Sequence, residues 1–161
     1  MSTLIEITQR LAEPRLHRAD PYLEPDEQRM RCLYATTKLL DWIRGTLPSL
    51  KGTHETSVRP KEQFEQLLYE FVSGKDLYVP RGFHILQPEV SGIWELKTTD
   101  IRVFGWFYVK GVFIGVNAGQ AQEIKAKKLY GSMRDEAQIY RDALDIDPPK
   151  FIPGTLQRDV I

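Results

Sequence analysis

The 161-residue chain is 42% hydrophobic and 27% charged, the composition of one ordinary globular domain, which excludes a disordered tail or a collagen-like rod. Its 22 Lys and Arg residues balance 22 Asp and Glu residues. Bulk charge therefore predicts neither a general nucleic-acid binder nor an acidic tail, and any anion site must be local.

The chain has one cysteine, Cys32, which permits no internal disulfide and no cysteine-based zinc site. It has no apolar run of about 18 residues, and its first residues lack the basic-then-apolar order of a signal peptide. We therefore expect a soluble, cytoplasmic protein.

The first half of the sequence predicts helices. Residues 1–25 show little periodicity and read as an arm or as a short helix at Leu4 to Leu11. From Asp26, apolar residues recur at helical spacing as far as Leu47, before Pro48. A second helix should begin at Pro60 and end at Gly74. Its apolar stripe is Phe64, Leu67, Leu68, Phe71 and Val72.

Beyond Pro80 the pattern changes to that of strands, rich in aromatic and β-branched residues. Four strands in succession predict an antiparallel meander. Lys110-Gly111 is compatible with a tight hairpin turn that places Tyr108 opposite Phe113. The predicted strands are Phe83 to Leu86, Ile93 to Lys97, Ile101 to Val109 and Val112 to Asn117.

Helical spacing returns after Gly119, is interrupted at Gly131, restarts at Ser132 and ends at Pro148-Pro149. Because helices and strands are segregated, the expected fold is α+β. Two N-terminal helices pack on a four-stranded antiparallel sheet, and C-terminal helices follow. We expect one domain over residues 26–147 and an extended tail over residues 148–161.

Several common sites are not indicated. His17, His54 and His84 are far apart, and none has the i, i+4 spacing with Glu of a helical zinc protease. Cys32 has the properties of a buried residue rather than a nucleophile. Gly111, Gly115 and Gly119 lie in or beside a strand pattern, where bulges or close backbone approach explain them. The sequence predicts no metal and no cofactor.

The first feature that requires an explanation is the presence of positively charged residues in otherwise apolar predicted strands. Lys97 and Arg102 each lie in a predicted strand, with Trp106 further along the second one. One interpretation is a cross-strand charge cluster with Glu95 on a wet sheet face. The other is a phosphate site, in which Arg binds through its planar fork and Lys as a point charge. Neighbouring aromatic rings such as Trp106 could then stack a base.

A short basic cluster on the helix after the sheet is the second feature. Lys125 and Lys128 share a helical face, whereas Lys127 points elsewhere. The cluster reads as a solvated surface, or as an anion patch if it lies beside the sheet. Tyr130 could transfer a proton, stack on a base or pack in the core.

Three consecutive segments carry a family resemblance. Phe83-His84-Ile85-Leu86, Gly92-Ile93-Trp94-Glu95-Leu96-Lys97 and Ile101-Arg102-Val103-Phe104 together resemble the core of RelE-like toxins, including the HigB-like and phage-derived branches. Those proteins read Trp-Glu-Leu-Arg and then an Arg-Val-aromatic strand. The resemblance covers about residues 60–117.

The resemblance implies a metal-independent endoribonuclease that cuts mRNA, often on the ribosome, and has a protein antitoxin as partner. Lys97 and Arg102 match the strand cations of the family as candidate catalytic and phosphate-binding residues. Lys125, Lys128 and Tyr130 lie near the place where many members have further basic residues and a terminal tyrosine or histidine. Lys128 and Tyr130 are thus further catalytic candidates, and Lys125 a phosphate-binding one.

The chain also departs from the family. Active members are strongly basic and short, whereas this chain is neutral and longer at both ends. Asn117-Ala118-Gly119-Gln120 stands where members commonly have a lysine pair. A catalytically inactive relative of prophage origin, which keeps the fold to bind a protein partner, is therefore the alternative hypothesis.

Overall fold

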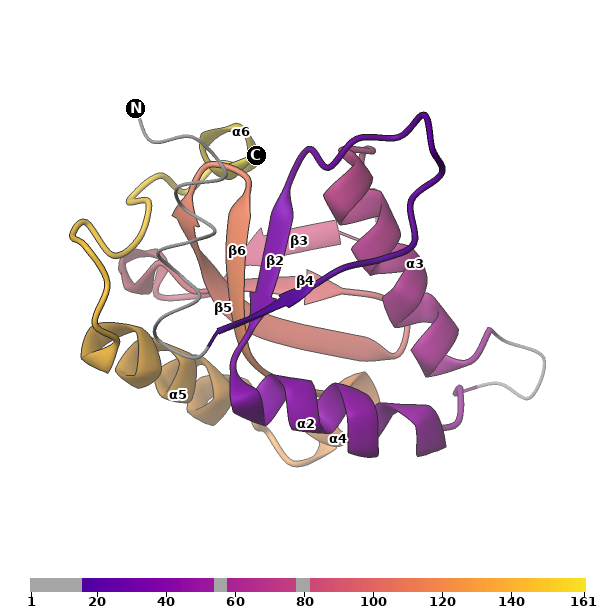
Figure 1. The fold of residues 1–161 in the computed structure, drawn as a ribbon. Coiled ribbons are helices and arrows are strands. Elements are labelled where there is room, and N and C mark those ends of the chain that lie inside the picture. The colour runs from indigo at the N-terminus through magenta and orange to yellow at the C-terminus, as the bar shows by residue number, and fades with distance from the viewer. Residues whose placement is uncertain (1–15, 54–57, 78–81) are drawn as a thin grey trace.

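The computed structural model describes residues 16–53, 58–77 and 82–161. Its centre is a six-stranded mixed sheet with the strand order β1-β2-β6-β5-β4-β3 (Figure 1). Neighbouring strands are antiparallel except β2 and β6, which are parallel. The strands are β1 (His17–Ala19), β2 (Cys32–Ala35), β3 (Gly82–Ile85), β4 (Trp94–Lys97), β5 (Ile101–Val109) and β6 (Val112–Gln120).

Helices cover both faces of this sheet. They are α2 (Thr37–Gly45), α3 (Pro60–Ser73), α4 (Ala121–Ala126), α5 (Tyr130–Ala143) and α6 (Gln157–Val160), with 3-10 turns at Leu47–Ser49 and Glu89–Ser91. No helix in the described ranges is long and apolar enough to cross a lipid bilayer.

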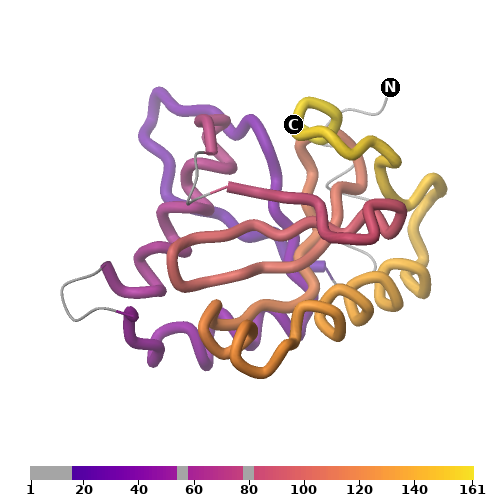
Figure 2. Tube along the Cα trace, turned by 180° about the vertical axis from the view of Figure 1, so that it is seen from behind, coloured from indigo at the N-terminus to yellow at the C-terminus, as the bar shows by residue number. Residues whose placement is uncertain are grey.

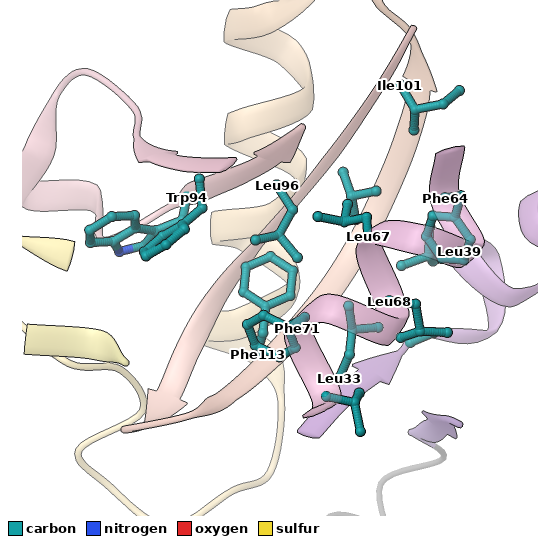
Figure 3. Close-up of a cluster of buried hydrophobic side chains, with 14 of the residues drawn as sticks. Leu33, Leu39, Phe64, Leu67, Leu68, Phe71, Trp94, Leu96, Ile101 and Phe113 are labelled. Carbon is teal, nitrogen blue, oxygen red and sulfur yellow. The ribbon is translucent and has the colours of Figure 1, made fainter. Parts of the chain in front are cut away.

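The α3 face of the sheet carries the larger core. Phe71 of α3 meets Phe107 and Phe113 at ring-centroid distances of 6.3 and 6.5 Å. Leu39 of α2 belongs to the same cluster, as does Leu96 of β4 (Figure 3). Burial of such side chains contributes about 1.5–3 kcal/mol each, so this layer holds the helix pair on the sheet.

The opposite face, called the α5 face below, carries the second core. There Trp106 of β5 and Ile114 of β6 pack with Ala137 of α5. Because side chains alternate along a strand, Arg102 and Phe104 share this face with Trp106. The tube in Figure 2 shows α4 and α5, in orange, next to β5, while β4 and β3 lie farther from these helices. The part of the α5 face formed by β3 and β4 is therefore not covered by α5.

Several predictions are confirmed. The second predicted helix is α3, which begins at Pro60 and ends at Gly74, whose φ of 83° suits a glycine. The four predicted strands correspond to β3, β4, β5 and β6. The α+β class is also confirmed.

The prediction of a four-stranded antiparallel sheet is wrong, because β1 and β2 extend it to six strands and β2 is parallel to β6. Residues 32–35, expected inside the first helix, form β2 with all four side chains buried. A buried central strand is apolar throughout, so its periodicity cannot be told from that of a helix. The helix proper starts only after Thr36, whose hydroxyl accepts a hydrogen bond from Leu39 N at 3.2 Å.

Both ends of the described chain differ from the prediction. His17–Ala19, expected in an arm, pair with β2, while the helix expected at residues 4–11 lies outside the described residues. The tail expected to be extended contains α6 and completely buries Val160. It runs from the α5 face, where Lys150 O accepts from Trp106 Nε1 at 2.9 Å, to the core of the α3 face.

Two local details are also corrected. Phe113 pairs with Phe107 rather than with Tyr108, because a β-bulge lies between Phe107 and Val109. The helix after the sheet breaks at residues 127–129, where Lys128 has a φ of 54°, and Gly131 lies inside α5.

The close contact of β5 with β6 generates a test of this sheet. A Cβ atom added at Gly105 would lie 2.0 Å from the Ile114 carbonyl oxygen, whereas one added at Gly45 would meet nothing within 4 Å. We expect Gly105→Ala to lower the free energy of unfolding by about 1–3 kcal/mol, measured by urea denaturation. The control Gly45→Ala should leave it unchanged or raise it by up to about 1 kcal/mol. Equal effects of the two substitutions would contradict the register.

Candidate functional site

Charged and polar side chains gather on the α5 face where β4 and β5 pass beyond the packed part of α5. Lys97 lies opposite Arg102, and His84 lies opposite Glu95 on the neighbouring edge strand. We call the whole group the β4–β5 polar cluster. Its members are His84, Glu95, Lys97, Arg102, Lys125 and Tyr130.

Arg102 is the most constrained member of this cluster. Its Nη1 donates to the carbonyl oxygens of Thr98 and Ile101 at 2.5 and 3.0 Å. Its Nε donates to the Tyr130 hydroxyl at 3.3 Å. Only 8% of Arg102 is exposed, and its Nη2 makes no hydrogen bond with a described residue. Arg102 therefore fixes its neighbours and leaves only one nitrogen for a ligand.

Glu95 is a buried carboxylate whose charge is only partly balanced by hydrogen bonds and neighbouring cations. It is 8% exposed, and its Oε2 has no hydrogen-bond partner among the described residues. The nearest cation is Arg102, whose Nε lies 4.0 Å from Oε2. Burial raises the pKa of Glu95, while Arg102, Lys97 and Lys125 oppose that rise. A carboxyl group with a raised pKa and an unused oxygen is suited to accept a proton from a substrate.

Lys97 and Lys125 are the cations free to bind an anion here. Lys97 is half-buried and Lys125 is exposed, and neither ammonium group forms an ion pair or hydrogen bond with a described residue. Both lie close enough to lower the pKa of Glu95. Two ammonium groups beside a proton-accepting carboxylate suit a phosphate group, which needs charge neutralisation while its bonds change.

The structure brings together four residues singled out from the sequence: Lys97, Arg102, Lys125 and Tyr130. Arg102 and Glu95 are buried, so they are not the wet-face charge cluster considered from the sequence. Tyr130 is half-buried and meets Phe104 edge-on at 5.7 Å. Its hydroxyl thus points toward the cluster while its ring is held by β5.

Other expected residues lie outside the cluster. Trp106 has no exposed surface and packs against Tyr140 of α5, so it presents no face to a base. Lys127 pairs with Glu123 on α4 at 2.8 Å. Lys128 is exposed in the α4–α5 connection, and its ammonium group forms no ion pair or hydrogen bond with a described residue.

His84 and Glu95 were not chosen from the sequence as site residues. His84 was judged by its spacing from other histidines and acids along the chain, which ignores strand pairing. The signal that could have found them is alternation along two adjacent strands, because residues 95 and 97 share one face. The β3–β4 register then adds His84 to that face.

An acidic hollow lies elsewhere on the molecule, between the segment after β1 and helix α3. A polyanion would be repelled there, so this hollow does not compete with the polar cluster for a phosphate ligand. Its lining includes Asp20, Glu24, Glu27, Glu62 and Glu65.

Comparison with known proteins returns no matching family model, no matching curated protein and no matching solved structure. Within the described ranges, no three His, Cys, Asp or Glu side chains are arranged to hold a metal ion.

The buried state of Glu95 predicts how stability changes with pH. Its pKa in the folded protein lies above the ordinary value of 4.5, so the folded state binds this proton more tightly than the unfolded state does. Its contribution to stability is therefore lost as the pH rises through the folded pKa. We expect Glu95→Gln to be more stable than the wild type near pH 8, with the difference vanishing near pH 4.

Urea denaturation at both pH values measures this difference. Glu123→Gln is the control, because Glu123 is an exposed residue paired with Lys127 and its replacement should bring no gain at either pH. A Glu95→Gln protein that is less stable near pH 8 would show that the carboxylate is well compensated in the fold.

Proposed function

We propose that the protein is an endoribonuclease of the RelE-like kind, which cleaves single-stranded RNA at the β4–β5 polar cluster without a metal ion. The observation that carries this proposal is the position of Glu95. A buried carboxylate with an unused oxygen lies among Lys97, Lys125 and Arg102 on one face of the sheet. A proton acceptor beside cations is the arrangement that phosphodiester cleavage by side chains needs.

The reaction supported by this geometry uses the ribose 2′-hydroxyl as nucleophile. Glu95 takes the hydroxyl proton, the 2′-oxygen bonds to the adjacent phosphorus, and the bond to the 5′-oxygen breaks. The departing 5′-oxygen takes up a proton. The products are a 2′,3′-cyclic phosphate end and a 5′-hydroxyl end. Because the nucleophile belongs to the substrate, no water has to be activated.

Each remaining residue of the cluster has a role in this proposal. Lys97 and Lys125 hold the phosphate and neutralise the charge that grows on it. Arg102 holds Tyr130 and the β4–β5 turn in place through Nε and Nη1, and offers Nη2 to the phosphate. Tyr130 lies where it can stack on a base or hydrogen-bond to the backbone.

The resemblance to RelE-like toxins supports mRNA as the substrate, the ribosome as the place of cleavage and a protein antitoxin as the partner. The neutral net charge of the chain favours a local phosphate site over broad binding to ribosomal RNA. The same resemblance leads us to propose that the protein is of prophage origin and acts in the cytoplasm.

Cleavage of a labelled single-stranded RNA by the purified protein, alone and with translating ribosomes, tests the proposal. We expect Lys97→Met to lower kcat/KM by about 100-fold. Lys125→Met should lower it less, because the charge of an exposed side chain is screened by salt. The matched control is Lys127→Met, since Lys127 directly follows the helix that carries Lys125 but is paired with Glu123, and it should retain wild-type activity.

The same RNA with a 2′-deoxy residue at the cleaved position should resist the enzyme. If wild-type protein leaves RNA intact both alone and on ribosomes, the ribonuclease proposal is wrong. Binding of a protein partner without cleavage would then favour the inactive interaction module. Equal losses in Lys125→Met and Lys127→Met would show that the phosphate is bound elsewhere.

A further inference from the structure

His84 lies on the edge strand β3, directly opposite Glu95 of β4. Its Nε2 is buried and has no hydrogen-bond partner among the described residues, and the same is true of Glu95 Oε2. Cross-strand neighbours have Cβ atoms about 5 Å apart. Two unused polar atoms on directly paired residues need an explanation, because buried polar groups are nearly always hydrogen-bonded.

We propose that His84 is a second catalytic residue of this site and shares one proton with Glu95, delivering it to the departing 5′-oxygen. This inference rests on the proposed ribonuclease function and names the proton donor that the reaction lacks. His84 is the member of the cluster that pairs directly with Glu95 across the sheet, and imidazole is the side chain whose ordinary pKa lies closest to neutral pH.

One shared proton is sufficient for a balanced reaction. In the reactive form, His84 is an imidazolium ion and Glu95 is a carboxylate. The proton of the 2′-hydroxyl moves to Glu95, the 2′-oxygen bonds to phosphorus, and the 5′-oxygen leaves with the proton of His84. Glu95 is then protonated and His84 is neutral. Transfer of that proton from Glu95 to His84 restores the reactive form.

The charges around the pair determine where the proton resides. Burial lowers the pKa of His84, and Lys97 of β4 and Arg102 of β5 lower it further. Burial raises the pKa of Glu95 against the opposing effect of those two cations and of Lys125 from α4. The Tyr130 hydroxyl of α5 accepts a hydrogen bond from Arg102 Nε.

Without ligand, these surroundings bring the pKa values of His84 and Glu95 closer together, because the first is lowered and the second is raised. A phosphate anion bound at Lys97 offsets the neighbouring cations and favours the imidazolium ion. Arrival of the substrate therefore moves the pair toward its reactive form.

Titration of the histidine ring protons by NMR tests the shared proton directly, with His84→Gln used to assign the resonance. We expect His84 of the wild type to titrate below about 6.5, the ordinary histidine value, and to shift upward when inorganic phosphate is added. In Glu95→Gln the value should fall further, because the carboxylate that favours the imidazolium ion is gone. An unchanged His84 titration in Glu95→Gln would overturn the shared proton.

His17 is the matched control. It lies on the opposite edge strand, exposed, with its Nε2 3.3 Å from the Thr37 hydroxyl, and its titration should not respond to Glu95→Gln.

Rates of RNA cleavage over a range of pH test the catalytic role. His84→Gln should lower kcat by about 100-fold or more and remove the fall in rate at high pH that marks a required proton donor, whereas His17→Gln should behave as the wild type. If the wild type cleaves RNA and His84→Gln does so with the same rate and pH profile, the role of His84 is wrong while the ribonuclease function stands. If the wild type cleaves no RNA, the function itself is wrong, and the catalytic role of His84 is wrong with it.

Discussion

The arrangement of the site depends on the hydrogen bonds of one side chain, Arg102. One guanidinium group joins the carbonyl oxygens of the β4–β5 turn, the hydroxyl of Tyr130 at the start of α5 and, at longer range, the carboxylate of Glu95. A buried cation whose donors are used by backbone carbonyl groups costs less than an unpaired one. The turn and the start of the helix are therefore positioned by the same side chain, and the two lysines remain free for a ligand.

The sequence predicted those parts of the fold in which each element shows its own period. Helix α3 has an uninterrupted apolar stripe between a proline and a glycine, and β5 and β6 are rich in aromatic and β-branched residues around a short turn. Strand β2 could not be predicted in this way. Its residues are buried on both faces, between β1 and β6, and such a strand has no polar side to reveal its period.

Part of the candidate site could be predicted from the sequence, because a charged residue is conspicuous in an otherwise apolar strand. Lys97 and Arg102 were found in this way, and the register places them opposite each other. His84 and Glu95 could be placed together only from the register of β3 with β4, which neither strand shows on its own. Trp106 was misjudged because an aromatic residue beside a cation looks the same in a sequence whether its ring is buried or exposed.

The parallel pairing of β2 with β6 has a consequence for biosynthesis. Residues 32–35 must wait for residues 112–115 before they gain a partner on that side, and the core of the α3 face also includes Val160, near the end of the sequence. Contacts so distant along the chain form late and slowly. A nascent chain leaving the ribosome therefore has no complete central sheet until most of it has been made. For a protein proposed to cut RNA, this delay would separate its own synthesis from the onset of its activity.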